Sequence, residues 1–167
     1  MTSTNLPIII MPAAGMDDYV FHYANSLAKN NKDISILIKD KTLQRFKKFI
    51  NPRVKVITIK NLRTRDLFSP FAYYSIAALS RKIINSGCKI FHLQNVGIWE
   101  LVLILFLKGK VKIVTTIHDP LTHITSNFTL YNFIEIITKH IIKISDGIVL
   151  HSHEQEIAIE KLFNFKI

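Results

Sequence analysis

The sequence predicts an α/β protein of the Rossmann-like type, in which a doubly wound, mostly parallel sheet of six to seven strands carries helices on both faces. Two observations predict this class. Short apolar runs alternate along the chain with longer segments whose apolar residues recur at helical spacing. The short runs are apolar at nearly every position, as strands covered on both faces are.

Two strand and helix pairs are predicted in the first third of the chain. The first strand, Pro7–Met11, ends at the loop Pro12–Gly15. The helix after it has one apolar face, made of Val20, Ala24, Leu27 and Ala28. The second strand is Ile34–Ile38. A short helix follows and is stopped by Asn51 and Pro52; its apolar side is made of Leu43, Phe46, Phe49 and Ile50.

The third and fourth strands are the short extended runs Val54–Ile59 and Ile90–Leu93. Between them, the basic loop Lys60–Asp66 leads to a helix that Pro70 opens, because proline suits the first helical turn. Gly87 is expected to cap the end of this helix, since glycine accepts the left-handed backbone found there.

The longest apolar stretch, Ile98–Leu107, is interrupted by Glu100 and is much shorter than the roughly 20 residues that cross a bilayer. We therefore expect a buried helix that ends at Gly109. The fifth strand then runs from Val111 toward His118.

The end of the chain predicts two more helices around a sixth strand. Leu130–Ile144 is a helix that is apolar on most faces, and Gly147–Leu150 is the strand. Ser152, with Gln155 three residues later, fits a capping box at the start of the second helix. A last strand is expected to begin near Phe165.

Length and composition indicate one domain covering residues 1–167, since 49% of the residues are apolar and 20% are charged. The single Cys88 excludes an intrachain disulfide. The first residues lack a secretion signal, so we expect a cytoplasmic protein. A net charge of +10 suggests an anionic counterpart, which could be nucleic acid, an acidic lipid surface or a phosphorylated substrate.

Basic residues are concentrated in the first half of the chain, where phenylalanines interleave with them. One interpretation is peripheral contact with an anionic membrane at its inner face; the other is an ordinary solvated face. The basic residues are Lys41, Arg45, Lys47, Lys48, Arg53, Lys55, Lys60, Arg63 and Arg65, and the phenylalanines are Phe46, Phe49, Phe68 and Phe71.

The candidate site lies where the fifth strand delivers His118 and Asp119 to its carboxyl end. In open parallel sheets, ligands bind outside the carboxyl ends of the strands, so this edge collects Gly15, His92–Asn95, His118–His123 and His151–His153. A rigidly held imidazole suits a donor or a base, and Asp119 could orient it. The alternative is a hydrogen-bonded structural histidine followed by a turn at Asp119 and Pro120.

Two other chemistries find less support at this edge. The loop at Gly15 could approach an anion at a helix N-terminus, but it lacks the G-x-G-x-x-G pattern, and an ordinary turn explains it equally well. No metal site is predicted, because the histidines show no H-E-x-x-H or paired-cysteine spacing.

Four segments resemble the amino-terminal domain of GT-B glycosyltransferases, in particular the family 4-like retaining enzymes that act on envelope sugars. They are the opening strand and loop with Leu27 and Ala28, followed by Lys89–Leu93, Val114–Asp119 and Ser145–Ser152. The last two are the most specific. The first loop departs from the family, which usually carries two glycines there, whereas this chain has only Gly15 after two alanines.

The resemblance implies an acceptor-side half of a hexosyltransferase. His118 matches the family histidine that contacts sugar or phosphate groups, so it is the catalytic and substrate-binding candidate, with Gly15, Asp119 and Ser152 as further substrate-binding candidates. A nucleotide sugar would be the co-substrate of the complete enzyme, held chiefly by a second domain with two glutamates that this sequence does not contain. The chain is therefore expected to bind no cofactor alone and to be nearly inactive without a partner chain.

Two other functions remain open. The chain could be a noncatalytic remnant or a subunit of a split glycosyltransferase, whose partner would carry the two-glutamate motif. It could also be a basic α/β module that binds nucleic acid through phosphates, although no recognised nucleic-acid motif is present.

Overall fold

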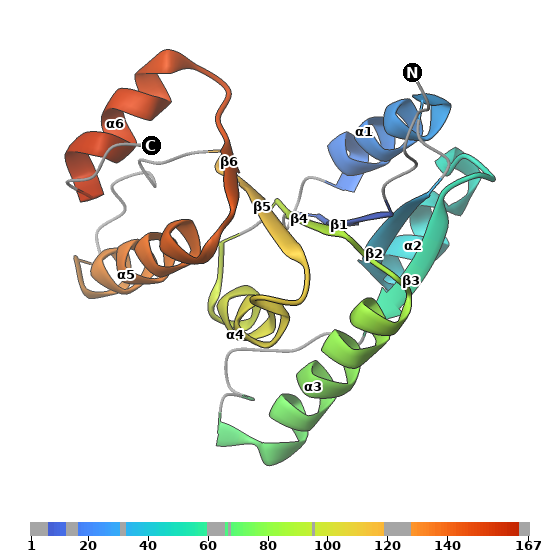
Figure 1. The fold of residues 1–167 in the computed structure, drawn as a ribbon, viewed down its shortest axis with the longest axis horizontal. Helices are drawn as coiled ribbons and strands as arrows, with labels where there is room; N and C mark the ends of the chain where they lie inside the picture. Colours follow the sequence, from blue (N-terminus) through green and yellow to red (C-terminus); the bar gives the residue numbers. More distant parts are fainter. Residues whose placement is uncertain are drawn as a thin grey trace.

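A computed structural model describes residues 7–12, 17–30, 33–59, 66, 68–94, 96–118 and 128–163. Within them, six strands form one sheet in the order β3-β2-β1-β4-β5-β6, and every pair of neighbours is parallel (Figure 1). The strands are β1 (Ile8–Met11), β2 (Ile34–Lys39), β3 (Lys55–Ile59), β4 (Ile90–Leu93), β5 (Lys112–Thr116) and β6 (Gly147–Val149).

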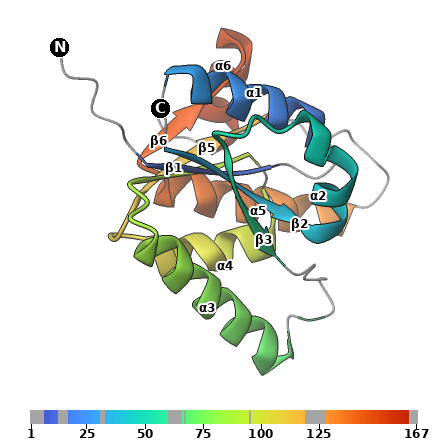
Figure 2. The ribbon, with the colours of Figure 1, turned by 90° about the vertical axis from the view of Figure 1, so that its right-hand side faces the viewer.

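Helices cover both faces of the sheet, as doubly wound sheets require (Figure 2). One face carries α1 (Asp17–Asn30), α2 (Asp40–Phe46) with a 3-10 turn at Lys47–Phe49, and α6 (His153–Phe163). The other face carries α3 (Pro70–Asn85), α4 (Ile98–Leu107) and α5 (Phe128–Ile144). The predicted Rossmann-like class is confirmed.

The larger hydrophobic core lies between the sheet and α3, α4 and α5. It is built on alternate strand residues that point to this face, among them Ile9, Leu37 and Phe91, which are at most 2% exposed. Helical residues such as Ile83 and Ile104 pack against them and are fully buried. At about 25 cal/mol per Å² of apolar area removed from water, this layer is the main source of stability.

A second core lies on the opposite face, between α1, α2 and the neighbouring strands. Val20, Ala24 and Ala28 of α1 pack there on Ile10 and Ile36, as the apolar face predicted from the sequence requires. The small alanines let the helix approach the sheet closely. A third, smaller cluster joins Ile117 to the helices at the β6 edge, through Ile142 and Ile159.

Glycines end two helices as predicted. Gly87 follows α3 with φ 77°, and Gly109 follows α4 with φ 75°, a backbone conformation that most side chains resist. The strand predictions also hold to within a residue or two, the clearest differences being β2, which extends to Lys39, and β5, which ends at Thr116. The predicted strand near Phe165 lies outside the described residues.

The prediction of a buried helix at α4 is only partly correct. Leu103, Ile104 and Leu107 are buried, but Leu105 and Phe106 are 53% and 39% exposed. The reason is that α4 belongs to an outer layer, so one of its sides faces away from the sheet. None of the described helices is both long and apolar enough to cross a membrane.

The strand order determines where the candidate site lies. The chain proceeds outward from β1 to β3 on one side and from β4 to β6 on the other, so successive crossovers diverge between β1 and β4. In open α/β sheets a crevice forms at such a point, outside the carboxyl ends of the strands. The residues that follow β1, β4, β5 and β6 therefore meet at one edge.

Candidate functional site at the carboxyl edge of the sheet

His118 lies two residues beyond β5, half-buried at the carboxyl edge. It is on the same side of the sheet as Thr116, which faces α1. Its backbone is fixed by Gln155 of α6, whose amide Nε2 donates to the His118 carbonyl over 2.9 Å. Gln155 Oε1 also accepts a hydrogen bond of 2.8 Å from the His151 amide. One side chain thus ties the ends of β5 and β6 together.

The imidazoles of His118 and His151 contact each other directly. His118 Nδ1 and His151 Nε2 share a hydrogen bond of 3.0 Å, and the rings stack with centroids 4.9 Å apart. Burial, and secondly the neighbouring His151, lower the pKa of His118. Both effects favour the neutral form of the His118 ring.

The second ring nitrogen of His118, Nε2, is buried and finds no hydrogen-bond partner within the described part of the chain. The hydrogen bond at Nδ1 determines the hydrogen-bonding role of Nε2. If Nδ1 donates to His151, Nε2 is an acceptor, and if Nδ1 accepts, Nε2–H is a donor. In either tautomer this atom is available to a ligand group.

Gln94, directly after β4, is the second group with unused hydrogen-bonding capacity. It is 1% exposed, and neither its Oε1 nor its Nε2 has a partner among the described residues. The backbone here is ordered, because the Gln94 amide donates to the Met11 carbonyl over 2.9 Å. Leaving a buried amide unpaired costs about 1–3 kcal/mol, which makes Gln94 a candidate ligand-binding residue.

Strand register places Gln94 near His118. Leu93 pairs with Thr115, so Gln94 lies beside Thr116 and shares its side of the sheet. His118 follows two residues later on that same side. With strands about 4.8 Å apart and a rise of about 3.3 Å per residue, the two Cα atoms are separated by about 8 Å. One small ligand can therefore reach both side chains.

Beneath this pair lies a buried polar layer. His92 Nε2 and the Thr116 hydroxyl share a hydrogen bond of 2.7 Å, and burial, followed by the nearby His118, lowers the pKa of His92 to about 4. Tyr23 of α1 sets its ring edge-on to His92, with centroids 5.5 Å apart. Tyr19 contacts His118 in the same way at 5.6 Å. Two tyrosines thus wall the site on the α1 side.

The predicted site residues have different outcomes. His118 lies at the centre of the cluster. Ser152 lies at its rim, where its Oγ accepts a hydrogen bond of 3.3 Å from the backbone N–H of Gln155. Ser152 therefore caps the start of α6 as predicted and is exposed, but the second bond of a capping box goes elsewhere, because Gln155 Oε1 accepts from the His151 backbone N–H rather than from that of Ser152. Gly15 and Asp119 lie outside the described residues.

Sequence reasoning missed Tyr19 and the bridging role of Gln155. It placed Gln94 at this edge, within His92–Asn95, but assigned it no role of its own. His151 was placed at the same edge without a predicted contact to His118. Within the described ranges, no three histidine, cysteine, aspartate or glutamate side chains gather closely enough to hold a metal ion.

The cluster is suited to uncharged hydrogen bonding. Neutral imidazole and primary amide groups both donate and accept, which matches hydroxyl groups that do the same. Tyr19 and Tyr23 add aromatic surface, and burial, then Tyr19, raises the pKa of Tyr23 so that it remains a phenol. A neutral ligand rich in hydroxyls fits this chemistry better than a strong acid.

Comparisons with known proteins assign no family. No family model and no curated protein matches the chain. Among solved structures, a probable glycerol dehydrogenase from Sinorhizobium meliloti 1021 is similar over 66% of this chain and 28% of its own, with 16% identity and a TM-score of 0.36. A likeness this distant supports no argument about function, and the fold class stands on strand order and direction alone.

Proposed function

We propose that this chain is the acceptor-binding half of a retaining glycosyltransferase that moves a sugar from a nucleotide sugar to a lipid-linked or polysaccharide acceptor. The observation that carries the proposal is a pair of buried polar groups at one edge, the Gln94 amide and His118 Nε2, for which the described residues supply no hydrogen-bond partner. Acceptor hydroxyls would complete their hydrogen bonds.

Chemistry at the edge supports a sugar over other ligands. Each hydroxyl of a sugar donates one hydrogen bond and accepts others, so a diol can satisfy both Gln94 amide atoms together. His118 is held neutral by its surroundings and can accept a proton from an attacking hydroxyl, which is the role of a general base. His151, bonded to its other nitrogen, would fix the tautomer.

The transfer itself needs more than this edge provides. Both substrates must be held together, and the charge that develops on the leaving phosphate must be stabilised. In this proposal a second domain or partner chain binds the nucleotide sugar, and this chain binds the acceptor. A lipid-linked acceptor would bring the protein to the inner face of an anionic membrane, which vesicle sedimentation can test.

Binding of methyl glycosides, followed by NMR of the histidine ring protons, tests the proposal. We expect saturable shifts at His118 and His151 with at least one common methyl hexoside. Gln94→Ala should weaken that binding about tenfold, as the loss of a paired neutral ligand contact does. The matched control is His140→Ala on α5, an exposed ring far from the edge, which should bind as the wild type does.

Three outcomes would count against this function. Tight binding of a nucleotide sugar by the isolated chain would contradict the division between halves. Absence of any glycoside-induced shift would remove the acceptor site. Binding to nucleic acid that falls steeply with salt and survives His118→Ala would favour a basic nucleic-acid module instead.

A further inference from the structure

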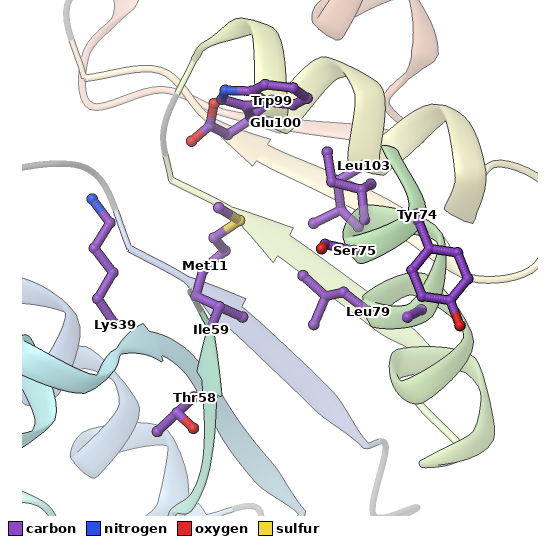
Figure 3. Close-up of a pocket in the computed structure, with 12 residues that line it drawn as sticks. Met11, Lys39, Thr58, Ile59, Tyr74, Ser75, Leu79, Trp99, Glu100 and Leu103 are labelled. Carbon is purple, nitrogen blue, oxygen red and sulfur yellow. The ribbon is translucent and has the colours of Figure 1, made fainter. Parts of the chain in front are cut away.

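A cavity of about 340 Å³ opens on the face of the sheet opposite His118, between the strand ends and helices α3 and α4 (Figure 3). This volume is within the range of about 300–1,000 Å³ that small-molecule sites occupy. Strands β1, β2 and β3 provide its floor, through Met11, Lys39, Thr58 and Ile59. The helices provide its walls, through Tyr74, Ser75, Ile76, Ala78, Leu79, Trp99, Glu100 and Leu103.

The walls of the cavity are mainly hydrocarbon and aromatic, with Ser75 and Glu100 as the polar wall residues. Figure 3 shows Leu103 of α4 above Leu79 of α3, with Met11 at the end of β1 to their left. The Ser75 hydroxyl donates to the Phe71 carbonyl over 2.8 Å, so its proton is already used. An apolar chain would be buried against Leu79, Leu103 and Met11 without needing hydrogen-bond partners there.

Apolar surface continues from the cavity along the N-terminal half of α3. Phe71 and Tyr74 are 82% and 70% exposed, and Phe68 just before the helix is 95% exposed. Aromatic side chains gathered in this way usually mark a binding surface. The continuity favours an elongated occupant, which begins in the cavity and extends over α3.

The two charged side chains that line the cavity, Lys39 and Glu100, lie at the end away from Tyr74. Figure 3 shows Lys39 reaching up from the end of β2, across the cavity from Tyr74. No ion pair holds Lys39 among the described residues. The Glu100 carboxylate is turned back onto Gly97 at the start of α4, where a side chain at position 97 would collide with it. Negative charge there complements the helix N-terminus.

We propose that this cavity binds an amphiphile with one linear or prenyl-like apolar chain and one anionic head group. The chain lies between Leu79, Leu103 and Trp99, and the head group pairs with Lys39 at the sheet edge. Apolar walls, the aromatic continuation along α3 and a lysine at one end match the two ends of such a molecule. The site does not depend on sugar transfer, since it shares no side chain with the His118 cluster.

Intrinsic fluorescence can test the site directly, because Trp99 is the single tryptophan of the chain and lines the cavity. Farnesyl phosphate, titrated below its micelle concentration, should change the Trp99 emission saturably. Farnesol should bind about fivefold more weakly, in keeping with the modest value of an exposed charge pair. Inorganic phosphate should produce no change, since it lacks the chain.

Variants separate the chain contact from the head-group contact. Ala78→Phe should abolish the signal by filling the cavity, whereas Asn85→Phe, exposed at the far end of the same helix, should leave it intact. Tyr74→Ser provides a second test and should weaken farnesyl phosphate binding. Lys39→Gln should reduce binding of farnesyl phosphate to the level of farnesol and leave farnesol unaffected. Circular dichroism should show the wild-type fold for all four.

Clear results would overturn the proposal. Non-saturable emission changes, or equal binding by wild type and Ala78→Phe, would remove the cavity as the site. Equal affinity for farnesol and farnesyl phosphate in the wild type would remove the head-group contact. Loss of binding in Asn85→Phe as well would show that the signal comes from the helix as a whole rather than from the cavity.

Discussion

Protonation of His92 should destabilise this protein in mild acid. The imidazole is buried on the central strand β4, is 5% exposed, and has its pKa lowered to about 4, compared with 6.5 in a free side chain. Above pH 6.5 the ring is neutral in both folded and unfolded chains and contributes no pH dependence. As the pH falls from 6.5 toward 4, only the unfolded chain takes up the proton, so stability is lost across this window.

The magnitude follows from the size of the shift. A pKa difference of about 2.5 units corresponds to about 3 kcal/mol at the acid limit, and to about 2 kcal/mol at pH 5. The loss is a large fraction of a typical domain stability of roughly 5–15 kcal/mol. Lowering of the His118 pKa acts in the same direction and adds to it.

Urea unfolding of the wild type and His92→Gln at several pH values between 7 and 4.5 measures this effect. Groups common to both proteins cancel in the difference. The variant should be less stable at pH 7, because it loses the Thr116 contact. Between pH 7 and pH 5, the unfolding free energy of the wild type should fall by about 2 kcal/mol relative to that of the variant. A gap that stays constant over this range would show that His92 does not hold a neutral ring in the folded protein.

Four further substitutions test the packing and the turns. Ile104→Ala, at a fully buried position in α4, should lower the free energy of unfolding by about 2–5 kcal/mol, seen as a lower urea midpoint. Asp146→Ala should lower the free energy of unfolding by about 1 kcal/mol, because the carboxylate accepts a hydrogen bond of 2.9 Å from the Ile113 backbone N–H. Lys112→Met should lower it by less, since that lysine is exposed. Equal losses in the two variants would refute this ranking. Asn25→Ala, which removes an amide bridging two backbone groups before β3, should cost about 1–2 kcal/mol and speed hydrogen exchange at the turn.

The order of strands and helices could be predicted because it depends on local patterns. Runs such as Ile34–Ile38 are apolar over too short a length for a helix, and the glycines at 87 and 109 stand where helices must end. Parallel pairing then follows from right-handed crossovers. The same reasoning placed His118 at the carboxyl edge, since its position requires only that β5 be a strand.

Contacts inside the site could not be predicted in this way. The bond between His118 and His151 depends on two rotamers and on the position of α6, which Gln155 sets by reaching back to both strand ends. The burial of Gln94 is likewise a tertiary property: its sequence neighbours are those of an ordinary polar turn. The cavity near Leu79 is a space between two helices, and its existence depends on their separation rather than on residue types.

The position of β1 at the middle of the sheet constrains how the chain can fold during synthesis. Ile8 pairs with Ile34 on one side and with Ile90 on the other, so β1 needs one neighbour that the ribosome synthesises much later than β1 itself. Until β4 emerges, the amino-terminal strand presents an unpaired edge with an apolar surface. Nascent chains that stall before β4 has left the ribosome should therefore need chaperone protection, whereas chains whose β5 has also emerged should already resist proteolysis.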